Sequence, residues 1–253
     1  MSILRFVLLL LILSIPITLS TRLMQAQPGS EAEKQEIAGK IKLEFLHAWR
    51  GYKQYAWGHD DLRPLSKTYH DWYAESLIMT PVDALDTMIL MGLTAEAEST
   101  KAFIIENLSF DKDIYVSNFE ITIRLLGSLL SNCQLTGDKR LLDLAENLGT
   151  RLLPVFDSPT GIPYRFVNLK TGNVRGPETN PAEAGTLLIE FGTLSKLTRN
   201  PVFYDKAKRA LVEVFKRRSP IGLVGQRINV ETGEWTNTNS HLSAEIEDRK
   251  SVV

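Results

Sequence analysis

The stretch SNFEITIRLLGSLLSNC (residues 117–133) decides the fold, because it is apolar on most of its faces and yet carries charge. A helix that is apolar nearly all round belongs inside a structure. Glu120 and Arg124 are four residues apart in it, which places both side chains on one face of a helix. Because burying a charge is costly, this pair requires a specific explanation.

Two explanations of the pair stay open on sequence physics alone. Glu120 and Arg124 could form a buried ion pair that ties helices together. Alternatively, Glu120 could be a pocket carboxyl that acts as a general acid, with the Arg124 guanidinium holding a substrate hydroxyl.

The chain on both sides of this stretch is predicted to be mainly helical. Thr80 and Pro81 form a cap-plus-proline start, which predicts a helix that ends near Gly92. Apolar residues with helical spacing or similar start signals predict further helices at 33–57, 95–107, 138–154, 181–197 and 201–218.

Two stretches interrupt this helical pattern. Residues 155–180 and 219–239 are rich in Gly and Pro, which predicts loops with short β-hairpins, one of them at 164–175. Neither alternation of strands and helices nor a phosphate-binding Gly loop is present. The sequence therefore predicts an all-α fold of paired helices, either a solenoid or an α/α toroid.

Composition excludes several functional classes. Lys and Arg total 29 against 30 Asp and Glu, so no net field favours nucleic acid. The single cysteine, Cys133, cannot form an internal disulfide, and zinc-ligand spacing is absent. We therefore expect Cys133 to be buried and inert.

The first residues differ from the rest of the chain. Arg5 precedes an apolar run at 6–19, which is shorter than the roughly 20 residues that span a bilayer. This pattern predicts a secretory signal peptide at 1–26, or alternatively an uncleaved signal anchor, followed by a linker at 27–32. Either alternative directs the body of the protein to an export compartment.

Other acidic residues are weaker candidates. Glu183 and Glu190 are seven residues apart on one predicted helix, where a solvated stripe is the simpler explanation. Asp83 and Asp86 lie near a predicted helix start, where carboxylates stabilise the helix dipole. The loop sequence His59-Asp60-Asp61 says little by itself. Carboxylates without a catalytic serine point weakly to glycoside hydrolysis, which needs two of them flanking one bond.

Ordered motifs strengthen that interpretation. They are HAWRGY (47–52), AWGHDDL (56–62), VDALDT (82–87), NFEITIRLLG (118–127), FDSPTGIPY (156–164), AEAGT (182–186) and NVETG (229–233). Together they resemble glycoside hydrolase family 47, the class I α-1,2-mannosidases, from about residue 45 to 246. The match covers the N-terminal half of the family's catalytic domain.

The resemblance implies a fold and a reaction. It implies an (α/α)7 barrel, of which residues 33–246 would form the N-terminal part, an incomplete toroid of paired helices with short β-hairpin insertions. It also implies an exo-acting, inverting α-1,2-mannosidase that trims high-mannose N-glycans. By the family's motifs, Glu120 would be the catalytic acid-side residue, Arg124 would contact the glycan and Glu183 would line the sugar pocket.

The resemblance implies a calcium ion, with its ligands in a C-terminal half that is missing here and no metal ligand in this chain. The tail at 247–253 departs from the family pattern, and we interpret it as artefactual. We expect an inactive fragment of a monomeric enzyme.

Its partners would be high-mannose oligosaccharides or glycoproteins, without nucleic acid. We expect a secreted or periplasmic protein, or alternatively one in the ER or Golgi lumen with membrane attachment through the N-terminal segment. Competing interpretations are a non-catalytic mannose-glycan-binding barrel of the same family and an unrelated α/α toroid.

Overall fold

The computed structural model describes residues 30–246. The predicted signal segment 1–26, the first half of the 27–32 linker and the 247–253 tail lie outside the described residues. Across the described part, no helix combines the length and the apolar character needed to cross a membrane. Contacts divide the chain after Phe45, within helix α2 (Glu31–Tyr55), into two units. In the first unit, the described residues form helix and expose the apolar side chains of Ile37, Ile41 and Leu43.

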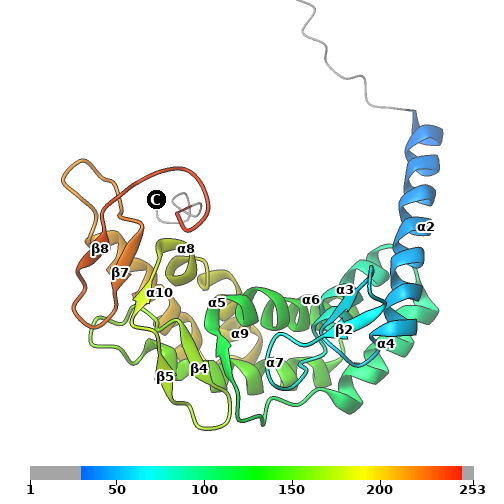
Figure 1. Ribbon diagram of the computed structural model, residues 1–253, viewed down its shortest axis with the longest axis horizontal. Coiled ribbons are helices and arrows are strands. Elements are labelled where there is room, and N and C mark those ends of the chain that lie inside the picture. Colours follow the sequence, from blue (N-terminus) through cyan, green and yellow to red (C-terminus); the bar gives the residue numbers. More distant parts are fainter. Residues whose placement is uncertain (1–29, 247–253) are drawn as a thin grey trace, which may run out of the picture. The chain divides into compact units, whose positions relative to one another are not determined.

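The second unit is built mainly from helices that pack in pairs along the chain (Figure 1). Helix α3 packs on α4, α6 on α7, and α9 on α10. After the end of α2, its helical elements are α3 (Met79–Leu90), α4 (Thr94–Asn107), α5 (Asn118–Ile121), η1 (Thr122–Leu126), α6 (Gly127–Thr136), α7 (Lys139–Leu152), η2 (Leu153–Phe156), α8 (Pro181–Gly185), α9 (Leu188–Thr198) and α10 (Pro201–Lys216).

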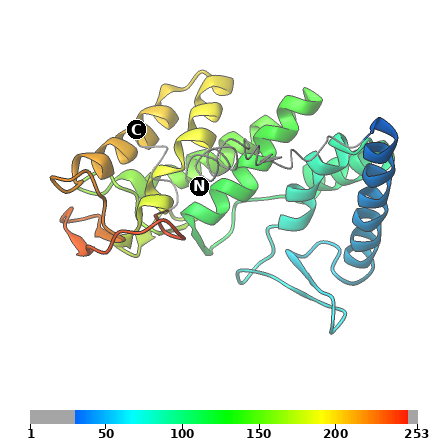
Figure 2. The same ribbon diagram turned by 90° about the horizontal axis from the view of Figure 1, so that it is seen from above.

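Short antiparallel strands accompany these helices. β1 (Asp61–Arg63) pairs with β2 (Thr68–His70). One three-stranded sheet has the order β3 (Tyr115–Ser117), β4 (Phe166–Asn168), β5 (Val174–Arg175), and another has the order β6 (Glu178–Thr179), β7 (Arg227–Asn229), β8 (Trp235–Asn237). β3 leads directly into α5, whereas β6 is separated from α8 by one residue. Figure 2 shows both three-stranded sheets on the same side of helices α6 to α10.

The stretch 117–133 lies inside the second unit, as its apolar character predicted: none of its residues is exposed. It is not one regular helix, however. α5 is followed by a π-helical turn, η1, and only then by α6. A π turn is frequent at functional sites and leaves little trace in apolar periodicity.

Two other predictions about helices are wrong. Helix α3 begins at Met79 with Ile78 at its N-cap, so Thr80 and Pro81 lie in the first turn and Thr80 is not the cap. The predicted helix at 181–197 is two helices, because α8 ends at Gly185 and α9 begins at Leu188. Glu183 and Glu190 therefore do not share one continuous helix face.

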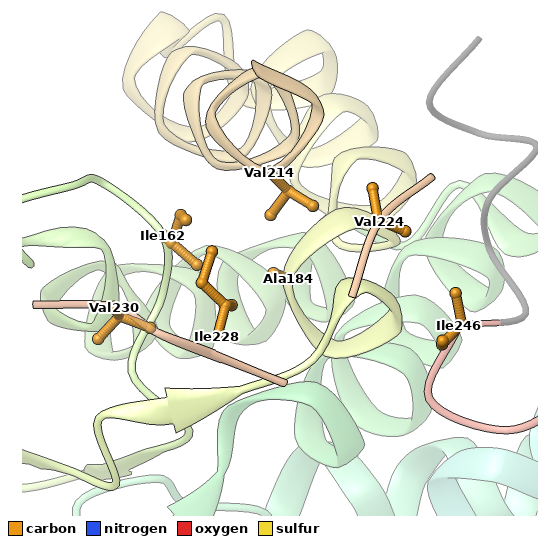
Figure 3. Packing of buried hydrophobic residues seen from close by; sticks show 7 residues of the cluster. All are labelled: Ile162, Ala184, Val214, Val224, Ile228, Val230 and Ile246. Atoms are coloured by element: carbon orange, nitrogen blue, oxygen red, sulfur yellow. The ribbon is translucent and has the colours of Figure 1, made fainter. Parts of the chain in front are cut away.

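A separate apolar cluster fixes the position of α8. It joins α8 and α10 to the segment that carries β7 and to the loop before β4 (Figure 3), and Tyr164 and Trp235 pack against it. Its buried members are Ile162, Ala184, Val214, Val224, Ile228, Val230 and Ile246. Because Ala184 follows Glu183 directly, this core also holds the Glu183 backbone in place.

Helix α7 begins with an N-cap whose side chain makes several hydrogen bonds. Asp138 is its N-cap and accepts a hydrogen bond from the Arg140 amide at 3.1 Å. The Arg140 guanidinium also donates to the Asp138 carboxylate, at 3.0 and 2.6 Å. These hydrogen bonds lower the pKa of Asp138 from 3.8 to about 2.

We expect Asp138→Ala to lower the free energy of unfolding by about 1 kcal/mol, the usual value of an N-cap. Because the folded-state pKa is depressed, this contribution is present above pH 3.8 and is lost as the pH falls toward 2. Chemical denaturation at pH 7 and pH 2.5 measures both effects. Asp143→Ala, at an exposed position of the same helix, is the control. Equal losses for the two variants at pH 7 would refute this role of Asp138.

Candidate functional site

Glu120 and Glu183 occupy equivalent places in the fold. Each is the third residue after the N-cap of a short helix that follows a strand. The Ser117 hydroxyl accepts from the Glu120 amide at 3.4 Å, and the Asn180 side chain accepts from the Glu183 amide at 2.9 Å. Each acid therefore lies in the first turn of a short helix that follows a strand of a three-stranded sheet.

Ser117 and Glu120 match a capping box, in which the Glu side chain would accept from the cap's own amide. That amide donates instead to the Tyr73 hydroxyl, at 3.1 Å. The Glu120 carboxylate accepts from Arg124 Nε at 2.9 Å. Glu120 is thus not needed for the cap, and its carboxylate faces the Arg124 side chain.

Arg124 lies in the π-helical turn and contacts three groups. Besides Glu120, its guanidinium carbon lies 5.0 Å from the centre of the Trp72 ring, within range of a cation–π interaction. Its Nη1 lies 4.0 Å from Asp83 Oδ2. Arg124 therefore connects α5 to the loop before α3 and to α3 itself.

The exposure of the pair bears on the two explanations that the sequence left open. The side chain of Glu120 is 33% exposed and that of Arg124 is 38% exposed. A pair this exposed and four residues apart contributes about 0.3–0.5 kcal/mol, so it is not a buried ion pair that holds helices together. The geometry therefore favours a pocket role.

A cavity of about 300 Å³ opens beside Arg124. Ligand pockets begin at about this size. Polar side chains predominate among its lining residues, which are Asp61, Trp72, Met79, Thr80, Asp83, Ala84 and Arg124.

The Trp72 wall of the cavity is held by hydrogen bonds. The indole Nε1–H donates to Asp61 Oδ2 at 2.6 Å. His70 Nδ1 lies 3.3 Å from the same oxygen. The indole ring is thus oriented beside the guanidinium, which gives the cavity one flat apolar wall next to charged groups.

Asp83 lines the same cavity. Burial raises the pKa of its carboxyl group, while the hydrogen bond from Ser128 and the nearby Arg124 charge act against this rise. The Ser128 hydroxyl donates to Asp83 at 2.8 Å, and Ser131 donates in the same way to Asp86 at 3.0 Å. Neither carboxylate lies in the first turn of α3, so helix capping does not account for them.

Neither Glu120 nor Glu183 lines the cavity itself: Glu120 is connected to it through Arg124, whereas Glu183 pairs with Arg165. The Glu183 carboxylate is 14% exposed and lies 3.1 Å from Arg165 Nη2. The Thr179 hydroxyl donates to it at 3.4 Å. The Arg165 carbonyl accepts from the Asn118 amide at 3.0 Å, which links this pair to the start of α5.

A calcium shell does not fit the described residues. Calcium takes about 6–8 oxygen ligands, usually several of them carboxylates. Within residues 30–246, no three His, Cys, Asp or Glu side chains converge on one point.

Sequence reasoning missed most of the cavity wall. Trp72 and Asp61 gave no periodic signal, because they lie in and beside a short hairpin. Asp83 and Asp86 did carry a usable signal: they are three residues apart, as are the two serines on α6 that contact them.

Known proteins resemble this chain. The rat endoplasmic reticulum mannosyl-oligosaccharide 1,2-alpha-mannosidase is 40% identical over 231 residues, covering 88% of this chain and 34% of that protein. Alpha-mannosidase I MNS5 of Arabidopsis thaliana is 36% identical, covering 86% of this chain and 42% of that protein. The chain thus spans well under half the length of these relatives.

A solved structure and a family model also match. The alpha-1,2-mannosidase from Trichoderma reesei aligns with a TM-score of 0.77 and 27% identity, covering 83% of this chain and 47% of that chain. The model of glycosyl hydrolase family 47 matches residues 44–248. The fold matches that of an α-1,2-mannosidase, and the chain belongs to glycosyl hydrolase family 47.

Proposed function

We propose that the whole protein is an exo-acting, inverting α-1,2-mannosidase that removes terminal mannose from high-mannose N-glycans or glycoproteins. The observation that carries the proposal is the Glu120 carboxylate, free of capping, hydrogen-bonded to Arg124 at the edge of a cavity. In this proposal Glu120 is the catalytic acid-side residue and Arg124 holds the glycan. Glu183 contributes to the sugar pocket.

The geometry supports this chemistry. Glycosidase catalysis needs a carboxylic acid that protonates the leaving oxygen. The Glu120 side chain is 33% exposed and accepts a hydrogen bond from Arg124, which lines the cavity, so its carboxyl group is accessible to a substrate oxygen. The guanidinium of Arg124 keeps further N–H groups for sugar hydroxyls, and the Trp72 face offers an apolar surface to a sugar ring.

We propose further that this chain is an inactive part of a partial (α/α)7 barrel. Large apolar side chains are exposed on the helices of the second unit: Leu90 is 75% exposed and Ile189 is 71% exposed. Ile189 and Leu135 line a second cavity, of about 380 Å³, between α6 and α9. Further barrel helices would cover these surfaces, which otherwise favour association.

The remaining parts of the proposal follow the family. Calcium would be held by residues outside 30–246, and the protein would act as a monomer in an export compartment. That compartment is either the secreted or periplasmic space or the ER or Golgi lumen, with the N-terminal segment as a possible anchor.

A non-catalytic glycan-binding barrel is the second candidate. Arg124, Trp72 and Asp83 form a polar cavity that could bind a sugar without cleaving it. Turnover by the whole protein distinguishes the two, because a binding barrel would retain affinity for the glycan but release no mannose.

Glu120→Gln in the whole protein should abolish mannose release from a Man9 glycan, because the amide has no acidic proton to give. Loss of general-acid catalysis corresponds to a rate decrease of about 10²–10⁴-fold. Chromatography of released mannose measures the rate. Glu106→Gln, at an exposed position of α4, is the matched control and should keep full activity. Unchanged release by Glu120→Gln would overturn the site assignment.

Arg124→Ala in this chain should weaken binding of α-1,2-mannobiose by about tenfold, the equivalent of one charge-assisted hydrogen bond. Ligand-observed NMR titration measures the dissociation constant. Arg140→Ala, in the exposed pair of α7, serves as the control and should bind like the wild type. Equal affinities for all three proteins would contradict the role of Arg124.

A calcium chelator should affect the whole protein but not this chain. Because residues 30–246 lack a converging set of acidic ligands, calcium and EGTA should leave the melting temperature of this chain unchanged. In the whole protein, EGTA should stop mannose release and added calcium should restore it. Release that is insensitive to EGTA would sink the calcium part of the proposal.

A further inference from the structure

Asp60 is a fully buried carboxylate that lies directly behind the cavity wall. Its side chain is 0% exposed, and both of its oxygens are used. Oδ1 accepts from the Leu77 amide at 2.7 Å and the Met79 amide at 3.2 Å. The Ser76 hydroxyl lies 3.1 Å from Oδ1 and shares its single proton with the Gly58 carbonyl, which is 3.0 Å away. Oδ2 accepts from the Trp72 amide at 3.0 Å. Three main-chain amides therefore donate to this one carboxylate.

The Oδ1 side holds a strained turn. Ile78, between the two amides bound by Asp60, has φ 47° and ψ 46°, in the left-handed region. For a β-branched residue this conformation is an outlier, and strain of this kind persists only where the surroundings enforce it. The two flanking amides are fixed by a single oxygen, which supplies that enforcement.

The two oxygens reach different walls of the cavity. Through Oδ1 and its main-chain carbonyl, which accepts from the Thr80 hydroxyl at 2.5 Å, Asp60 fixes the first turn of α3. That turn contributes Met79 and Thr80 to the cavity. Through Oδ2 it fixes the backbone of Trp72, which forms the facing wall.

Asp60 is itself anchored from behind. Its amide donates to Asp71 Oδ1 at 2.9 Å, while Asp71 Oδ2 lies 2.9 Å from His59 Nδ1. Burial alone would raise the pKa of Asp71, but these hydrogen bonds outweigh it and hold the pKa below its ordinary value. The Tyr52 hydroxyl donates to the His59 carbonyl at 2.7 Å. The chain around Asp60 is therefore tied to α2.

We propose that Asp60 is the positioning residue of this site, with each carboxylate oxygen holding one wall of the sugar cavity at a fixed separation. The part of this proposal that concerns binding of a mannoside rests on the proposed function. The placement of the Trp72 wall by Oδ2 does not, and it can be tested without any ligand.

Asp60→Asn separates the two roles, because an amide has only one acceptor oxygen. Two amides and the shared Ser76 hydroxyl meet Oδ1, whereas one amide meets Oδ2, so the amide oxygen will take the Oδ1 place. The Asn NH₂ group then faces the Trp72 N–H, and this hydrogen bond is lost. We expect the α3 turn to persist while the Trp72 segment is released.

The indole ¹H–¹⁵N signals of the full chain report this release. The chain has four tryptophans, and Trp72→Phe identifies the signal of Trp72. In Asp60→Asn the Trp72 signal should shift or broaden while the other three stay in place. Ser76→Ala is the matched control: it removes the hydroxyl on the Oδ1 side, which also contacts the Gly58 carbonyl and the Ile78 amide, and it should leave the Trp72 signal unchanged. An unmoved Trp72 signal in folded Asp60→Asn overturns the proposal.

Two further measurements complete the test. In the wild type, hydrogen exchange should show that the Trp72 amide is as protected as the amides of Leu77 and Met79. An unprotected Trp72 amide would refute the role of Oδ2, and this result does not depend on whether Asp60→Asn folds. Asp60→Asn should also weaken α-1,2-mannobiose binding by about tenfold, and Ser76→Ala should not. Wild type that does not bind mannobiose counts against the proposed function, whereas unchanged affinity in Asp60→Asn counts against Asp60.

Discussion

The burial of α6 is the constraint on which the arrangement of the site depends. A buried hydroxyl without a partner costs about 1–3 kcal/mol, and two serines of this helix find their acceptors on the helix packed against it. Ser128 meets Asp83 and Ser131 meets Asp86, both on α3. These two contacts, one turn apart on each helix, fix the register between α3 and α6. Because this register is fixed, Asp83 of α3 lies beside Arg124, although the two residues are far apart in the sequence.

The π turn of η1 reconciles two demands on one stretch of chain. Glu120 and Arg124 must face the cavity, while Ser128 must face α3. In a regular α-helix, Glu120 and Ser128 would point about 80° apart, since each residue turns the helix by about 100°. One extra residue in a π turn reduces this difference to roughly 20°. The wide turn thus lets the charged pair and the α3-binding serine share one side of the segment.

The sequence predicted the features that depend on residues close together in the chain. The helix from Pro201 was placed within two residues of its observed end at Lys216, because its start signal and apolar period are both local. The contact of Glu120 with Arg124 likewise follows from their spacing. The cap of α3 was misassigned, because Ile78 is held in a left-handed conformation by Asp60, from 18 residues earlier. The Trp72 wall also depends on tertiary hydrogen bonds, which no periodic pattern encodes.

The contacts of Arg124 also bear on which carboxylate could act together with Glu120 in catalysis. An inverting glycosidase keeps its two carboxyl groups about 6.5–9.5 Å apart, with room between them for a water molecule. Asp83 is the acidic neighbour that shares Arg124 with Glu120, at 4.0 and 2.9 Å. The Arg124 guanidinium contacts both acids, and Asp83 also accepts a hydrogen bond from Ser128. These contacts support a role of Asp83 in holding Arg124 in place beside Glu120.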